Sequence, residues 1–323
     1  MNELILGIDG GGSKTIVVQA DRFGNVLDAR HGRGTNPIDD PDWVQVLVNL
    51  LEPFASRPIA GVAAALPAYG EVDTLSSAQE RAVRGVFPGA KVRLLNDVDG
   101  AQIGAFAGAS GTLIRSGTGS MAWARDASGR SHRSGGWGEV IGDEGSAHWI
   151  GRRLLGAVSK ALDGRAEMTA LAPAVYDELG ADLAQGMNGL EGWVAHLKSP
   201  RAQIAALAPI ASRLAERGDR AALAIIEDAA HELALHVAAI ESGAKFHGEW
   251  SYAGGAFASG PLLAAVTRHI GRAPAAPKLP PIGGALLAAA QHLGWPITAE
   301  FVERLAVALR REPAKTPDLQ LTT

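Results

Sequence analysis

The stretch LILGIDGGGSKTIVVQA, residues 4–20, decides the fold. Its apolar start, Leu4–Asp9, predicts a short strand, and the β-branched residues of Thr15–Ala20 predict a second one. Three successive glycines lie between them, within Gly10–Lys14, so a tight turn joins the two strands. An Asp-x-x-Gly sequence at residues 21–24 is typical of a further hairpin turn. The chain therefore begins with strands joined by two tight turns.

The first glycine-rich turn, Gly10–Lys14, allows three interpretations. A P-loop needs Gly directly before Lys, and Ser13 occupies that place. A dinucleotide fingerprint needs Gly at the sixth position and then a helix, but Thr15 stands there and a strand follows. What remains is a hairpin whose backbone N–H groups face one concavity, which suits phosphate oxygens. An ordinary hairpin needs at most two glycines, so we interpret the turn as a phosphate site, with Ser13, Lys14 and Thr15 as further donors.

The opening pattern recurs in the middle of the chain. Residues 113–129 again run strand, glycine-rich turn, strand and Asp-x-x-Gly turn, with Ser116–Ser120 as the glycine-rich part. The two Asp-x-x-Gly turns begin at Asp21 and Asp126, 105 positions apart. A repeat of this length implies a duplicated domain. Coincidence is the alternative, because the chain has 40 glycines, but three successive features match.

A candidate carboxylate lies where a later strand ends. The run Ile59–Leu66 is apolar throughout, as expected of a strand buried on both faces, and Lys91–Leu95 predicts the next strand. Asn96 and Asp97 follow it directly. Ligands gather at the carboxyl ends of strands in open α/β sheets, which favours a functional role for Asp97. The alternative is that Asp97 caps the helix that follows.

Beyond residue 145 the pattern is mostly helical. Helices are expected near Ala147–Leu162, Ala202–Arg217, Arg220–Phe246, Gly283–Leu293 and Thr298–Arg311, and a late strand at Trp250–Ala253.

Composition narrows the class of protein. The 323 residues are 47% hydrophobic and 20% charged, which is normal for a globular protein and enough for two domains. A net charge of −4 leaves no basic footprint for nucleic acid and no polybasic membrane anchor. The start of the chain lacks signal-peptide features, and no apolar run approaches the ~20 residues of a membrane span, so we expect a cytoplasmic protein. The absence of cysteine excludes disulfides, thiolate catalysis and iron–sulfur clusters.

Six stretches in order resemble the N-acetylglucosamine kinase branch of the acetate kinase, sugar kinase, heat-shock protein and actin superfamily, a branch that includes the BadF/BadG/BcrA/BcrD ATPases. They run from residue 4 to about 290, and Gly135–Ala147 is the most specific. The stretches are Asp9–Thr15, Gly34–Asn36, Asn96-Asp97, Gly117–Ser120, Gly135–Ala147 and Ala253–Phe257.

The resemblance implies a duplicated, actin-like (ribonuclease H-like) α/β fold of two domains with an interdomain cleft. The N-terminal domain would comprise residues 1–111 plus about 297–312, and the C-terminal domain residues 112–296, with a flexible tail at 313–323. It further implies an ATP- and Mg²⁺-dependent kinase that phosphorylates the 6-hydroxyl of N-acetylglucosamine, and a homodimer.

The resemblance also assigns roles to individual residues. The ATP phosphates would be bound by Gly10, Gly11, Gly12, Ser13, Lys14, Thr15, Gly117, Thr118, Gly119 and Ser120. The adenosine would be bordered by Gly254, Gly255 and Ala256. The sugar would be contacted by Asn36, Asp97, Gly136, Trp137, Gly138 and Asp143. Asp9 would position Mg²⁺ through water, and Asp97 would take the proton from the 6-hydroxyl.

Some alternatives stay open. Asp143 could instead supply a first-turn acid to the next helix, and Trp137 could pack in the core. Glucosamine, N-acetylmuramic acid and N-acetylmannosamine are rival substrates. An activator ATPase of reductive enzymes would need cysteines for its cluster, and a sugar-responsive regulator would need a helix-turn-helix, for which we expect no room before residue 4.

Overall fold

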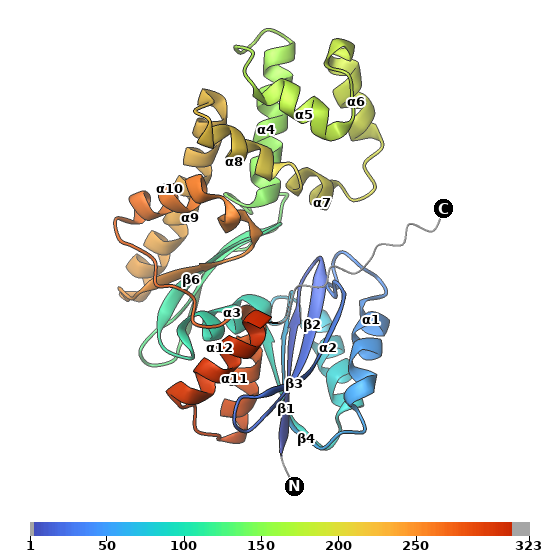
Figure 1. Cartoon of the computed structure of the whole chain (residues 1–323), viewed down its shortest axis with the longest axis vertical. Helices are drawn as coiled ribbons and strands as arrows, with labels where there is room; N and C mark the ends of the chain where they lie inside the picture. Colours follow the sequence, from blue (N-terminus) through green and yellow to red (C-terminus); the bar gives the residue numbers. More distant parts are fainter. Residues whose placement is uncertain (1–2, 312–323) are drawn as a thin grey trace. The chain divides into compact units, whose positions relative to one another are not determined.

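The computed structural model describes residues 3–311, folded as two compact units (Figure 1). Unit 1 comprises residues 3–113, 127–129 and 276–311, and unit 2 comprises Ile114–Asp126 and Arg130–Ala275. The tail expected at 313–323 lies outside the described residues. Within residues 3–311, no helix has the length and apolar character needed to cross a membrane.

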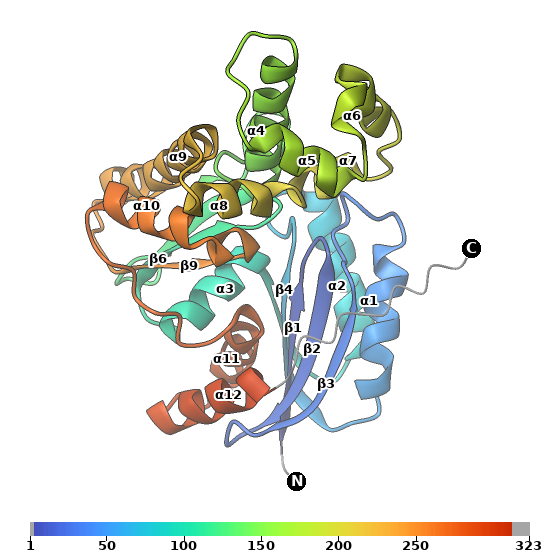
Figure 2. The same cartoon turned by 45° about the horizontal axis from the view of Figure 1, so that its top comes forward.

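Unit 1 is built on a five-stranded sheet with the order β3-β2-β1-β4-β5 (Figure 2). Its strands are β1 (Leu4–Gly10), β2 (Lys14–Asp21), β3 (Val26–Arg33), β4 (Ile59–Leu66) and β5 (Lys91–Asn96). The hairpin strands β1, β2 and β3 are antiparallel, whereas β1, β4 and β5 run parallel. The carboxyl ends of these three parallel strands therefore meet at one edge of the sheet.

Helices cover both faces of this sheet. They are α1 (Trp43–Leu51), the short η1 (Glu52–Phe54), α2 (Asp73–Val86), α3 (Asp97–Phe106), α11 (Pro281–Leu293) and α12 (Ala299–Arg311). Because side chains alternate along a strand, Leu6 and Ile8 pack in the core under α1 and α2, while Ile5 packs with Leu286 of α11.

The helix α11 belongs to unit 1, whereas the sequence assigned it to the C-terminal domain of residues 112–296. Its whole segment Ile282–Ala290 is buried, because it packs against both the sheet and α3. A Cβ on Gly284 would lie 1.9 Å from the carbonyl oxygen of Gly100 in α3. This absence of side chains lets the two helix backbones touch.

Unit 2 is built around a four-stranded sheet with the order β8-β7-β6-β9. Its strands are β6 (Gly111–Ser116), β7 (Ser120–Arg125), β8 (Ser131–Gly135) and β9 (Trp250–Ala253). The order matches β3-β2-β1-β4 of unit 1, with the first, second and third strand of each copy in the same places. The predicted duplicated α/β fold is confirmed.

The remaining helices of unit 2 share one core. They are α4 (Ala147–Leu162), α5 (Leu171–Leu179), η2 (Leu183–Gln185), α6 (Met187–Ala195), α7 (Pro200–Ala205), α8 (Ala208–Glu216), α9 (Arg220–Ala244), η3 (Gly255–Ala258) and α10 (Gly260–Ile270). The expectation of one helix over Ala202–Arg217 is wrong. Pro209 lies in the first turn of α8, where its missing N–H is tolerated, so a new helix starts after Leu207.

The contact between α3 and α11 gives a stability prediction. We expect Gly284→Ala to lower the free energy of unfolding by about 1–3 kcal/mol, because the added methyl group overpacks a backbone contact. Gly85→Ala in α2 is the control, since a Cβ there meets nothing within 4 Å and alanine favours a helix. Chemical denaturation measures both variants. A Gly284→Ala protein as stable as the Gly85→Ala protein would contradict the close-packed interface.

Candidate functional site

The first glycine-rich turn joins β1 to β2 in unit 1. Gly12, Ser13 and Lys14 are exposed there, as a phosphate-binding turn requires. Thr15 is different, because its side chain is fully buried and its Oγ1 lies 2.9 Å from Oγ1 of Thr35. The predicted donors Ser13 and Lys14 are therefore at the surface, and the Thr15 hydroxyl is engaged inside.

The segment after β3 supports this turn from behind. The N–H of Thr35 donates to the carbonyl of Gly11 at 3.0 Å. A Cβ on Gly34 would lie 2.1 Å from the carbonyl oxygen of Gly12, so a larger residue would push the turn out of place. The predicted stretches Asp9–Thr15 and Gly34–Asn36 thus form one local structure.

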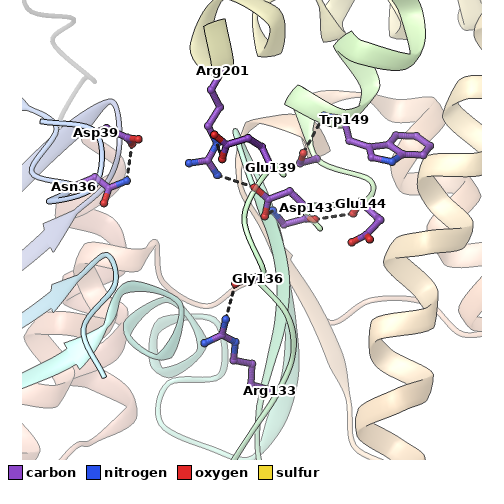
Figure 3. Close-up of polar contacts among 11 residues, drawn as sticks. Asn36, Asp39, Arg133, Gly136, Glu139, Asp143, Glu144, Trp149 and Arg201 are labelled. Carbon is purple, nitrogen blue, oxygen red and sulfur yellow. Dashed lines mark hydrogen bonds and ion pairs between the residues drawn. The ribbon is translucent and has the colours of Figure 1, made fainter. Parts of the chain in front are cut away.

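Asn36, a predicted sugar contact, is buried and held by its own loop. Its Nδ2 donates to Oδ2 of Asp39 at 2.5 Å, and its Oδ1 accepts from the N–H of Ile38 at 3.2 Å (Figure 3). The Asp39 carboxylate also lies near Gly12, 3.4 Å from where a Cβ would be. Sequence reasoning missed Asp39, which stands in no motif.

Asp97 is the first residue of α3 and is buried. The helix is capped by its neighbour Asn96, whose Oδ1 accepts from the N–H of Val98 at 3.0 Å. The alternative of Asp97 as the N-cap is therefore wrong. The Nδ2 of Asn96 also donates to Oε1 of Glu71 at 3.0 Å, which fastens the loop after β4 beside Asp97.

Asp9 shares the sheet edge with Asp97. Asp9 pairs with Ala65 and Ala65 pairs with Leu95, so Asp97 lies two residues beyond the level of Asp9. Mg²⁺ is usually bound through one or two carboxylates, waters and substrate phosphates. Asp9, beside the predicted phosphate turn, fits that pattern. Residues 3–311 hold no group of three His, Cys, Asp or Glu suited to a metal.

The second glycine-rich turn, Gly117–Ser120, is bound to the stretch that starts α4. The N–H of Ala147 donates to the carbonyl of Gly117 at 2.8 Å. The hydroxyl of Ser120 donates to the carbonyl of Glu144 at 2.6 Å. A Cβ on Gly117 would meet nothing within 4 Å, so there is open space beside this part of the turn.

The end of β9 completes this group in unit 2. Gly254 has φ +104° and passes so close to the carbonyl oxygen of Ser116 that a Cβ would lie 2.2 Å from it. The next residue, Gly255, has open space where its Cβ would be. The structure therefore brings together the predicted phosphate turn, the predicted adenosine turn and the residues around Asp143.

Asp143 is almost fully buried and adopts φ +59°. Its Oδ1 accepts from the N–H of Ser120 at 3.2 Å, and its Oδ2 accepts from Nη2 of Arg201 at 2.7 Å (Figure 3). Asp and Asn adopt this left-handed conformation more readily than other non-glycine residues, and its cost is offset here by the two hydrogen bonds. The first-turn alternative is wrong, because Ser146 caps α4 and the first turn carries no acid. Sequence reasoning missed Arg201, which comes from α7.

The loop between β8 and Asp143 carries the predicted sugar contacts Gly136, Trp137 and Gly138. Trp137 is 69% exposed, so the alternative of core packing is wrong. Arg133 lies over its ring at 5.8 Å and donates to the carbonyl of Gly136 at 2.5 Å. A large aromatic face is thus presented at the surface of unit 2.

Two histidines border this region. Burial lowers the pKa of His236 in α9, whose Nδ1 lies 3.2 Å from Oγ of Ser134. Burial also lowers the pKa of His148, with Arg152 as a second cause. Both side chains therefore favour the neutral form when the protein is folded.

The chain is similar to known proteins in sequence and in structure. The sequence pattern of the BadF/BadG/BcrA/BcrD ATPase family matches residues 6–289. The N-acetylmuramic acid/N-acetylglucosamine kinase of Clostridium acetobutylicum is 29% identical over 245 residues, 73% of this chain and 78% of the relative. The N-acetyl-D-glucosamine kinase of Dictyostelium discoideum is 30% identical over 258 residues, 72% of this chain and 77% of the relative. A Chromobacterium violaceum structure, provisionally assigned as an N-acetylglucosamine kinase, has a TM-score of 0.74 and 25% identity, covering 88% of this chain and 98% of that one.

The buried histidines predict acid sensitivity. An unfolded histidine gains a proton near its ordinary pKa of 6.5, but folded His236 resists the proton, so stability is lost as the pH falls through about 6.5. We expect thermal unfolding temperatures to fall between about pH 7.5 and pH 5, and to fall less in a His236→Gln variant. Equal acid sensitivity in the two proteins would contradict a contribution from His236.

Proposed function

Because the chain belongs to the BadF/BadG/BcrA/BcrD ATPase family, as its motifs predicted, we propose that it transfers the γ-phosphoryl group of ATP to the 6-hydroxyl of N-acetylglucosamine. The two curated relatives, which are named as kinases of N-acetylated amino sugars, confirm the predicted class of ATP-dependent sugar kinase. The acceptor position and the particular sugar are part of the proposal.

The observation that carries the proposal is the place of Asp97. A buried carboxylate stands at the carboxyl end of β5, and the capping that would otherwise explain it is done by Asn96. A sugar hydroxyl is a weak nucleophile, so a carboxylate that accepts its proton raises the rate. In our proposal Asp97 is this base, the Asp143 carboxylate accepts a hydrogen bond from another hydroxyl, and the Asn36 amide hydrogen-bonds to the sugar.

The phosphates are assigned to the two glycine-rich turns. Backbone N–H groups and exposed donors such as Ser13 and Lys14 suit the oxygens of a nucleotide, and Gly117 leaves room for close approach. Phosphoryl transfer depends chiefly on positioning and charge neutralisation. Mg²⁺, held by Asp9 and the phosphates, would supply part of that charge neutralisation. Gly254, Gly255 and Ala256 are assigned to the adenosine.

N-acetylmuramic acid is the second candidate substrate, because one relative is named as a kinase of both sugars. The two sugars differ by a lactyl ether at the 3-position, so one site can serve both only if it leaves room there. Our proposal also includes a cytoplasmic location, where ATP is present, and a homodimer, which sedimentation velocity can test.

The first functional prediction concerns turnover. Purified protein with Mg·ATP should release ADP when N-acetylglucosamine is added, and less or none with glucose. A coupled assay across N-acetylglucosamine, N-acetylmuramic acid, glucosamine, N-acetylmannosamine and glucose measures this, with product mass and NMR locating the phosphate. No sugar-dependent ADP release from any of the five would refute the kinase proposal.

The second prediction isolates the base. Asp97→Asn keeps the side-chain size but removes the proton acceptor, so kcat should fall roughly 10²- to 10⁴-fold. The melting temperature should change little, because Asn96 remains as the cap, asparagine keeps the side-chain size, and the lost first-turn charge is worth about 0.3–1 kcal/mol. Affinity for Mg·ATP should be retained.

Asp99→Asn is the matched control, since Asp99 is the other buried acid in the first turn of α3. It should keep kcat within a few-fold. Near-normal turnover of a folded Asp97→Asn protein would end the assignment of Asp97 as the base.

A further inference from the structure

Arg201 reaches the candidate sugar residues of unit 2 from the first turn of α7 (Figure 3). Its Nη2 donates to Oδ2 of Asp143 at 2.7 Å, and its Nε lies 3.2 Å from Oε2 of Glu139. The side chain of Asp143 is only 4% exposed. A carboxylate buried to this extent is costly unless a cation and hydrogen bonds compensate its charge. Arg201 supplies the cation and Ser120 supplies a backbone N–H.

The position of the Arg201 backbone is fixed by helix packing as well as by the ion pair. A Cβ on Gly151 in α4 would lie 2.1 Å from the carbonyl oxygen of Ile204 in α7. The backbone of α7 therefore rests directly on α4, and Ala205 of α7 is buried. The short helix is held in one place, so Arg201 points to Asp143 before any ligand arrives.

The same cation connects two points of one loop. Glu139 lies in the middle of residues 136–143, and Asp143 ends it. This loop contains Trp137, so its shape decides where the exposed indole stands. The Nε of Arg201 has no hydrogen-bond acceptor among the described residues, which makes the contact to Glu139 looser than the one to Asp143.

Two roles compete for Arg201. Its Nη2 would be 2.8 Å from a Cβ on Gly119, so the guanidinium also lies beside the predicted phosphate turn. However, the same Nη2 is directed at Asp143 with a short hydrogen bond. Each oxygen of Asp143 keeps lone pairs after accepting one hydrogen bond, so the carboxylate can still accept from a hydroxyl. The geometry therefore favours a role of Arg201 in holding Asp143 over a direct contact between Arg201 and phosphate.

We propose that Arg201 is a positioning residue of the sugar site, which holds Asp143 and the loop 136–143 in their binding arrangement without touching the sugar. This inference rests on the proposed function. Because the acceptor and the loop are ordered in advance, binding does not have to order them. Loss of Arg201 should therefore weaken the affinity for the sugar and leave the affinity for the nucleotide unchanged.

Calorimetric titration of N-acetylglucosamine into Arg201→Met, Arg201→Lys and the unaltered protein tests the proposal. We expect Arg201→Met to weaken sugar binding about 10- to 100-fold. Arg201→Lys should recover part of the loss, because lysine restores the charge but not the planar fork. Arg213→Met is the matched control, since its ion pair to Glu178 at 3.7 Å is half exposed, and it should stay within twofold.

Glu139→Gln is a second, milder variant for the case that Arg201→Met does not fold. It removes only the looser contact, so it should weaken sugar binding a few-fold at an unchanged melting temperature. Mg·ATP affinity should stay within about threefold in every variant. Unaltered sugar binding in Arg201→Met, or a loss confined to Mg·ATP, would overturn the positioning role while leaving the kinase proposal intact. If the unaltered protein itself binds none of the amino sugars, the proposed function fails and this inference fails with it.

Discussion

At Gly254 the chain leaving β9 passes so close to Ser116 that a Cβ would lie 2.2 Å from its carbonyl oxygen. The same kind of backbone contact occurs at Gly34 against Gly12, and at Gly284 against Gly100. Any side chain at these places would separate the two segments, because protein interiors close-pack and do not absorb an extra methyl group freely. Both candidate phosphate turns depend on such a contact, so their shape is set by what stands behind them.

Local sequence signals predicted much of the architecture. The strands Ile59–Leu66 and Trp250–Ala253 and the helix Ala147–Leu162 have the bounds that the pattern indicated. These segments are bordered by turn or cap residues, such as Ser146 before α4, so the start and end signals are encoded nearby. The recurrence of strand, glycine turn and strand was also sufficient to predict two related sheets.

The parts that sequence did not reveal depend on tertiary packing. Asn and Asp cap helices about equally well, so nothing in the pair Asn96-Asp97 tells which one caps until the backbone is seen. Arg201 stands in no motif, and its place at Asp143 follows from how α7 rests on α4. Likewise α11 is apolar on all sides over Ile282–Ala290, and such a segment does not indicate which of two similar sheets it covers.

The return of α11 to unit 1 has a consequence for synthesis on the ribosome. One face of the first sheet, including Ile5 and Val18, packs under a helix that begins at Pro281, more than 260 residues later in the chain. All residues from Arg130 to Ala275, which form most of unit 2, leave the ribosome before that helix does. Until α11 has emerged, this sheet of unit 1 keeps an uncovered apolar face. Such an exposed face is a natural target for chaperones that act on nascent chains.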